Sequence, residues 1–185
     1  MKKKLSVVLC LLSVATTSFA APQYGGPFGG PFGVDGGSLV RWRSIVGVIT
    51  SQGVNNPVSP KIDSGTFAWS VRSGNANVSL TNGAAFFQVE GLVINGTMFS
   101  GTPGPVTAVI GTLVCNPGDP AQEAALDTPQ VPLNGRGNAV FSGFIPNIPS
   151  GCGNPLFLVR IANPAGAAGR WIATGAGRSL SNQGQ

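Results

Sequence analysis

The chain has 185 residues, of which 9% are charged, and it contains 28 glycines, 15 prolines and no histidine. This composition is typical of turns and extended segments, and the lack of histidine removes the commonest metal ligand and the usual general base of serine and cysteine hydrolases. The formal net charge of +5 falls to 8 − 6 = +2 without Lys2, Lys3 and Lys4, and the arginines are scattered, which argues against nucleic acid as a partner.

Residues 1–20 have the three parts of a secretory signal peptide. They are a basic start (Lys2 to Lys4), an apolar stretch (Leu5 to Val14) and a small-x-small cleavage site ending at Ala20. The apolar stretch is far shorter than the roughly 20 residues that span a bilayer, and no later segment is apolar for that long. We therefore predict a bacterial export signal, a periplasmic or extracellular product, and no transmembrane helix in the mature chain.

Residues 21–37 contain the sequence GGPF twice in succession. Glycine and proline at this density hold neither a helix nor a strand ladder, so this segment is predicted to be a flexible tail. The pattern then changes, and we predict a folded domain over residues 38–177. Residues 178–185 are small and polar and are predicted to be a second flexible tail.

Alternation of apolar and polar residues predicts two strands early in the domain. In residues 39–50 the apolar positions of one face are Val40, Trp42, Val46 and Val48, and the other face has Arg41 and Arg43. The residues Phe67, Trp69 and Val71 alternate in the same way with Ala68, Ser70 and Arg72. Because large aromatic side chains dominate protein cores, we expect Trp42 and Trp69 to be buried.

Three Asn-Gly pairs lie between segments that are rich in strand-forming residues: Asn82-Gly83, Asn95-Gly96 and Asn134-Gly135. Asn-Gly suits the two central positions of a type I′ turn, where both residues need positive φ, so each pair predicts a β-hairpin. The first hairpin would join residues 76–81 to residues 84–90. Further apolar, β-branched runs predict strands over residues 106–115, 139–145, 155–161 and 170–174.

About eight short strands at this spacing favour an all-β fold, an antiparallel β-sandwich of the immunoglobulin-like type. The signal, the alternation and the length also permit a small outer-membrane β-barrel. Against the barrel, the chain does not end on an aromatic residue and has a single tyrosine for two interfacial girdles. The sandwich is therefore the predicted architecture.

Two cysteines follow the signal sequence, Cys115 and Cys152. An oxidising compartment favours their pairing, so we predict one disulfide. Two buried free thiols are the alternative. Two cysteines without a histidine cannot complete a tetrahedral zinc site, so no metal site is predicted there.

The acidic residues are few and scattered: Asp35, Asp63, Glu90, Asp119, Glu123 and Asp127. A glycosidase needs two carboxylates that face each other across a cleft, and such a pair is an open but remote alternative. Asp119 is a plausible N-cap for one or two helical turns, on which it would share a side with Glu123 and Asp127 as Ca²⁺ ligands. The spacing matches no calcium loop, so no calcium site is predicted here. Because the chain also lacks histidine, we predict no enzymatic activity, no metal and no cofactor.

Three residues are candidates for surface binding. Trp171 follows Arg170 near a glycine-rich turn, and an exposed indole could stack on a sugar ring. Arg41 and Arg43 lie opposite Trp42 on their strand and should face outward. The predicted partners are therefore another protein, including a second copy through sheet edges, or a glycan.

Several short motifs occur in a recognisable order between about Trp42 and Thr174. They are Val58-Ser59-Pro60, Gly65-Thr66-Phe67, Val89-Glu90-Gly91-Leu92, Gly101-Thr102-Pro103-Gly104-Pro105-Val106, Phe157-Leu158-Val159-Arg160-Ile161 and Asn163-Pro164-Ala165-Gly166. This order resembles the chordin-type (CHRD) β-sandwich domain of secreted proteins. That family carries histidines in its central and final strands, whereas this chain has none. The resemblance implies a sandwich fold and an extracellular, non-enzymatic role, and it transfers no functional residue.

The function favoured by these observations is an exported, non-enzymatic structural or interaction domain. A carbohydrate-binding module is the first alternative, and a small outer-membrane barrel is the second.

Overall fold

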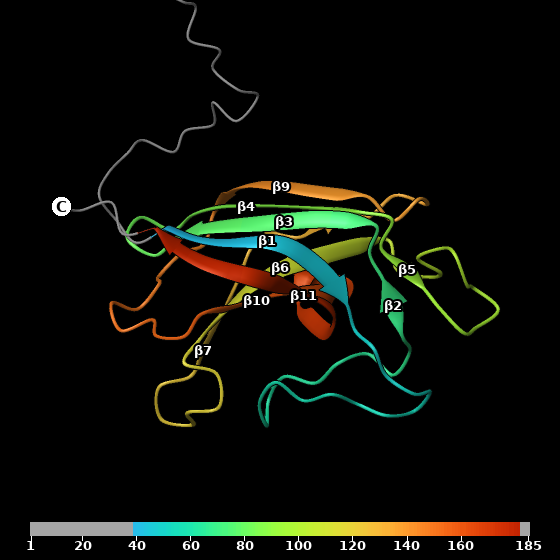
Figure 1. The fold of residues 1–185 in the computed structure, drawn as a ribbon, viewed down its shortest axis with the longest axis horizontal. Helices are drawn as coiled ribbons and strands as arrows, with labels where there is room; N and C mark the ends of the chain where they lie inside the picture. Colours follow the sequence, from blue (N-terminus) through green and yellow to red (C-terminus); the bar gives the residue numbers. More distant parts are fainter. Residues whose placement is uncertain (1–38, 182–185) are drawn as a thin grey trace, which may run out of the picture. The chain divides into compact units, whose positions relative to one another are not determined.

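The computed structural model describes residues 39–181 (Figure 1). The predicted signal peptide, the N-terminal tail and residues 182–185 lie outside the described residues. The elements, in chain order, are β1 (Leu39–Gly47), β2 (Trp69–Ser70), β3 (Ser73–Ser79), β4 (Ala84–Glu90), β5 (Val93–Ile94), β6 (Ala108–Cys115), β7 (Ala124–Asp127), β8 (Val131–Pro132), β9 (Ala139–Phe144), β10 (Leu156–Ala162), the 3₁₀ turn η1 (Pro164–Gly166) and β11 (Ala168–Ser181).

The strands form one curled antiparallel sheet and a small separate ribbon. The order in the sheet is β7-β6-β10-β11-β1-β3-β4-β9, with β8 also paired to β6, and β2 pairs with β5 in the ribbon. In Figure 1, β3, β4 and β9 lie in one layer and β6 and β10 in the layer below. The predicted all-β, sandwich-like antiparallel fold is confirmed.

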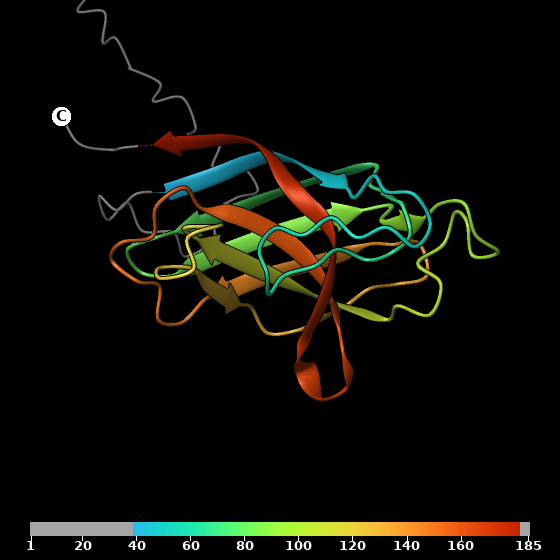
Figure 2. The same cartoon turned by 90° about the horizontal axis from the view of Figure 1, so that it is seen from below.

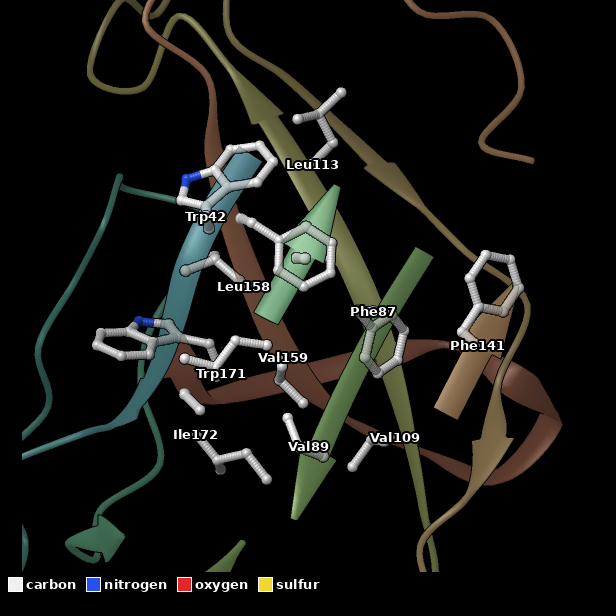
Figure 3. Close-up of a cluster of buried hydrophobic side chains, with 14 of the residues drawn as sticks. Trp42, Phe87, Val89, Val109, Leu113, Phe141, Leu158, Val159, Trp171 and Ile172 are labelled. Carbon is white, nitrogen blue, oxygen red and sulfur yellow. The ribbon is translucent and has the colours of Figure 1, made fainter. Parts of the chain in front are cut away.

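A row of aromatic rings fills the space inside the curl (Figure 3). Trp42 of β1 contacts Phe157 of β10, Phe157 contacts Phe87 of β4, and Phe87 contacts Phe141 of β9, with ring centroids 5.5, 5.5 and 5.8 Å apart. The strands β4 and β10 are not neighbours in the sheet. The contact between Phe87 and Phe157 therefore joins the two layers across the core.

Two glycines in the strands make room for these rings. A Cβ atom on Gly111 of β6 would lie 2.7 Å from Phe87 and 2.8 Å from Phe157. A Cβ atom on Gly175 of β11 would lie 2.5 Å from Trp42. Because protein interiors are close-packed, the rings fit against these two strands only because each strand has a glycine at the point of contact.

The predicted alternation of β1 holds only for its first half. Val40 and Trp42 are buried as expected, but Ile45 is buried in place of Val46, whose side chain is 44% exposed. Gly177, with a φ of 64°, lies against Arg43, between the pairs Trp42–Arg178 and Ser44–Ala176. This left-handed residue interrupts the regular pleat of the β1–β11 pair, and the strand changes phase there.

Of the three hairpins predicted at Asn-Gly pairs, only the first forms, and none of the three pairs adopts a type I′ turn. β3 and β4 form the predicted hairpin around Asn82-Gly83, but only Gly83 has positive φ. Its N–H donates to the carbonyl of Ser79, so the loop is longer than a type I′ turn. At the second pair, β5, which precedes Asn95, is antiparallel to the earlier strand β2, so no hairpin forms around Asn95-Gly96. At Asn134 the residue with positive φ is Gly137, and β8 pairs with β6 instead of β9.

The predicted end of the domain at residue 177 is also wrong. β11 continues to Ser181 because it stays paired with β1 as far as Leu39.

The predicted disulfide is confirmed, and it joins Cys115, at the end of β6, to Cys152 with Cα atoms 4.7 Å apart. No helix within residues 39–181 is long and apolar enough to span a membrane.

Candidate binding site

One end of the sheet is extended by loops. There the segment 48–68, the β2–β5 ribbon and the loop 95–107 lie together (Figure 1). The ribbon is joined to the segment that directly follows β1 by a hydrogen bond from the N–H of Trp69 to the carbonyl of Val48. The loop closes on itself because the N–H of Ile94 donates to Thr102 and the N–H of Gly101 donates back to Ile94. Residues 96–100 are therefore presented on a hydrogen-bonded turn.

These elements enclose an apolar pocket of about 490 Å³, a volume within the usual range for small-ligand sites. Large apolar side chains in its lining remain open to solvent: Phe67 is 38% exposed, Phe99 45% and Met98 91%. The remaining residues of the lining are Gln52, Gly65, Thr66, Trp69, Ile94, Gly96, Thr97, Pro105, Val106, Ile161 and Arg170. The strand predicted around Phe67 is limited to β2, so that Phe67 faces the pocket instead of the core.

The prediction that Trp69 is buried is confirmed, and its indole lines the pocket. The indole N–H forms no hydrogen bond with any other residue of the range 39–181. The nitrogen lies 3.8 Å from the place where a Cβ on Gly65 would stand, and Gly65 also lines the pocket. Trp69 thus brings to the lining of this apolar pocket an indole N–H that has no partner among residues 39–181.

The candidate Trp171 is buried, contrary to the expectation of a surface ring. It is 8% exposed, and its indole N–H donates to the carbonyl of Asn56 at 3.0 Å. The segment that covers it runs beside β11, where the N–H of Gly65 donates to the carbonyl of Trp171 and the N–H of Trp171 donates to the carbonyl of Asp63. Figure 2 shows this segment crossing β11. Trp171 therefore has no open face on which a sugar ring could stack.

A second, polar hollow adjoins the apolar pocket. Its lining is Lys61, Asp63, Arg160, Ile161, Asn163, Ala168, Gly169 and Arg170. Ile161 and Arg170 belong to the linings of both hollows. Figure 2 shows the adjoining β10–β11 turn projecting beyond the sheet. The neighbouring Arg170 donates from one guanidinium nitrogen to the carbonyl of Ser64 at 2.9 Å, which fixes its direction.

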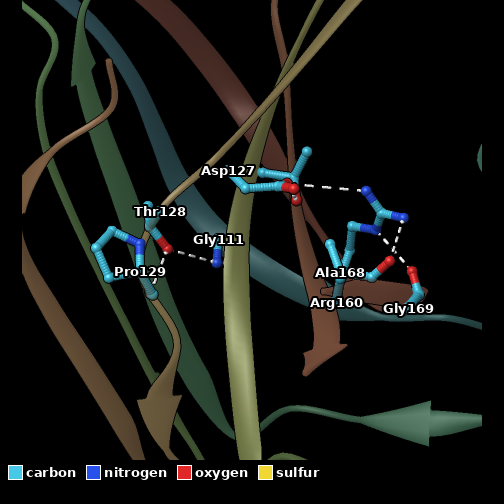
Figure 4. Close-up of polar contacts among 8 residues, drawn as sticks. Gly111, Asp127, Thr128, Pro129, Arg160, Ala168 and Gly169 are labelled. Atoms are coloured by element: carbon cyan, nitrogen blue, oxygen red, sulfur yellow. Dashed lines mark hydrogen bonds and ion pairs between the residues drawn. The ribbon is translucent and has the colours of Figure 1, made fainter. Parts of the chain in front are cut away.

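Arg160 is the least exposed cation of the polar hollow (Figure 4). Its side chain is 12% exposed and donates to the carbonyls of Gly169 and Ala168 at 2.7 and 3.0 Å. Burial lowers the pKa of the guanidinium, and the carboxylate of Asp127, 3.8 Å away, acts in the opposite direction. An arginine keeps its charge in proteins, so this group contributes a fixed positive charge.

The remaining candidates lie apart from both hollows. Arg41 and Arg43 are exposed on β1, as predicted, and line neither hollow. The three carboxylates at four-residue intervals do not share a helical face, the alternative considered for a calcium site, because the segment makes a turn followed by β7. Asp119 accepts from the N–H of Ala121, Glu123 accepts from Gly118, and Asp127 accepts from Thr112. No group of three potential metal ligands occurs among the described residues.

Sequence reasoning missed the residues that make the apolar pocket. A signal was present, because Met98 and Phe99 stand among turn-forming residues that directly follow Asn95-Gly96. Two large apolar residues in such a segment suggest an exposed apolar loop, since loops run over protein surfaces. Comparison with known proteins adds no candidate, because the chain matches no family model, no curated protein and no solved structure.

Proposed function

We propose that this chain is an exported, non-enzymatic binding domain, and that the apolar pocket between Phe67 and Phe99 is its binding site. The observation that supports this most strongly is the exposure of Phe67, Met98 and Phe99 around one concave, apolar surface. Exposed apolar patches on soluble domains are characteristic of interaction and ligand sites. The hydrogen-bonded turn that holds Met98 and Phe99 favours a pocket that exists before the ligand arrives.

The chemistry of the chain favours binding over catalysis. There is no histidine in the sequence. Several carboxylates are engaged in structural contacts: Glu90 pairs with Arg72 at 3.2 Å, and Asp127 accepts from Thr112 at 2.6 Å. Residues so engaged are poorly placed to transfer protons to a substrate.

Export is supported by the signal-like residues 1–20 and by the disulfide. The likeness to CHRD domains belongs to the same proposal, as a family of extracellular, non-enzymatic sandwiches. Intact mass of the chain recovered from the periplasm or medium tests export directly. We expect residues 21–185 with two hydrogens fewer than after reduction, and retention of residues 1–20 would refute it.

Binding is tested with N-phenyl-1-naphthylamine, a neutral apolar dye that fluoresces in apolar surroundings. We expect a saturable rise in fluorescence with the purified chain. Phe99→Ser should weaken dye binding at least about tenfold, because contact with an aromatic side chain is worth about 1.5 to 3 kcal/mol when fully buried.

Phe144→Ser is the matched control, because Phe144 on β9 is 59% exposed and lies outside the pocket lining. It should leave dye binding unchanged. Equal losses in the two variants, or no fluorescence change with the unaltered chain, would overturn the proposed binding site.

A further inference from the structure

The geometry points to a ligand class for this site: we propose that it binds a single-chain amphiphile with an anionic head group. The apolar chain would lie between Phe67 and Phe99, and the head group would lie at Lys61 and Arg170. This inference rests on the proposed function, because it names the ligand of the same pocket. Its experiment below is arranged so that the two can fail separately.

The first argument is that the apolar pocket and the cationic hollow are neighbours on the surface. Arg170 and Ile161 belong to the linings of both. A molecule that fills the apolar part and extends past Ile161 therefore meets the guanidinium of Arg170. The apolar pocket itself has no carboxylate in its lining, and Arg170 is its one charged residue.

The second argument is the charge of the polar hollow. Lys61, Arg160 and Arg170 oppose a single lining carboxylate, Asp63, which gives 3 − 1 = +2. Asp127 contacts Arg160 from outside this lining, and counting it leaves 3 − 2 = +1. The hollow therefore favours an anion on either count.

The third argument is that two of these cations have free donors. Lys61 and Arg170 form no ion pair with any residue between 39 and 181. Arg170 uses one nitrogen on the carbonyl of Ser64, and its other N–H groups have no partner within that range. A guanidinium held in this way can donate two parallel hydrogen bonds to a carboxylate, sulfate or phosphate. Arg160, in contrast, is less exposed, already donates to Gly169 and Ala168, and lies 3.8 Å from the carboxylate of Asp127.

The experiment compares three ligands with the same ten-carbon chain: decanoate, decanol and decyltrimethylammonium, each below its micelle concentration. Displacement of N-phenyl-1-naphthylamine from the purified, full exported chain gives the affinities. At low salt we expect decanoate to bind at least about tenfold more tightly than decanol, as one charge-assisted contact permits. Decyltrimethylammonium should bind more weakly than decanol, because its head group meets like charges.

Substitutions then locate the head group. Lys61→Gln combined with Arg170→Gln should remove the preference for decanoate, measured as the ratio of the decanoate affinity to the decanol affinity of the same variant. Lys61→Gln alone should reduce the preference. This single variant keeps the hydrogen bond from Arg170 to Ser64, so its result does not depend on how the loss of that bond affects folding. Arg41→Gln combined with Arg43→Gln is the matched control, because it removes the same net charge from an exposed strand outside the hollow. This control should keep the full preference.

Equal affinities of the unaltered chain for decanoate and decanol, or an undiminished preference in the combined Lys61→Gln, Arg170→Gln variant, would overturn the inference and leave the proposed function standing. Failure of every ligand and of the dye would overturn both. Binding to phosphatidylglycerol vesicles without binding to monomeric decanoate would also overturn it, because it would indicate a membrane surface instead of a single-chain ligand.

Discussion

Two groups of large apolar side chains in this domain have opposite surroundings. In the core, Trp42, Phe157, Phe87 and Phe141 form a continuous row that both layers of the curled sheet cover. At the loop end, Phe67, Met98 and Phe99 remain open to solvent. The residue types are similar, so the difference lies in what covers them. The row has strands on both sides, whereas the loop cluster is bordered by a two-stranded ribbon and loops.

This contrast separates stability from binding. Burial of apolar surface contributes roughly 25 cal/mol per Å², so the covered row should dominate the folding free energy. The open cluster has not yet gained this contribution and can gain it when a ligand covers it. Substitutions in the two regions should therefore change different measured quantities.

Phe157→Ala should have the largest effect on stability. Phe157 is fully buried and contacts both Trp42 and Phe87, so its truncation should cost about 3 to 5 kcal/mol of unfolding free energy. Phe144→Ala is the control, since Phe144 is 59% exposed, and it should cost less than about 1 kcal/mol. Urea unfolding followed by fluorescence measures both. Similar costs for the two variants would show that the aromatic row does not form the core.

Removal of the disulfide should be next in size. The bond closes a span of 37 residues, and the double variant Cys115→Ala, Cys152→Ala should lose about 2 to 4 kcal/mol of unfolding free energy. Cys115 ends β6, whereas the pocket residue Val106 precedes the start of that strand. Dye binding should therefore be unchanged under conditions where the variant is folded. A parallel loss of dye binding would contradict the separation of the two regions.

Gly111→Ala tests the packing of the aromatic row by adding a single methyl group. The new Cβ would stand 2.7 Å from Phe87, so Phe87 or Phe157 must move, at a cost of about 1 to 3 kcal/mol. Gly135→Ala is the matched control, because a Cβ there meets nothing within 4 Å, and it should change stability by no more than about 0.5 kcal/mol. Equal unfolding free energies for the two variants would indicate a core looser than this row of rings implies.

The parts of this fold that the sequence predicts correctly are those determined by local pattern or by a single possible pairing. Alternation places Val40 and Trp42 inside, and Cys115 and Cys152 form the predicted disulfide. The Asn82-Gly83 hairpin is local as well. In each case the decisive interactions lie within a few residues or, for the disulfide, join the two cysteines of residues 39–181.

The parts that sequence reasoning missed depend on distant partners. β11 extends to Ser181, through small residues with little strand preference, because β1 pairs with it. Trp171 is buried because the segment around Asn56 crosses β11 and accepts its N–H. The pocket brings together residues 52–106 with Ile161 and Arg170. No periodicity in the sequence reports contacts of that kind.

Met98→Ser should have the smallest effect on stability and still alter binding. Its side chain is 91% exposed, so the unfolding free energy should change by no more than about 0.5 kcal/mol, while dye binding should weaken because Met98 lines the pocket. Urea unfolding and dye titration of the same preparation provide both values. A stability loss as large as that of Gly111→Ala would mean that Met98 is covered in solution. Size-exclusion chromatography of the unaltered chain would then show whether a second copy covers Met98. In that case burial of Phe67, Met98 and Phe99 would contribute to the unfolding free energy, as burial of the core residues does.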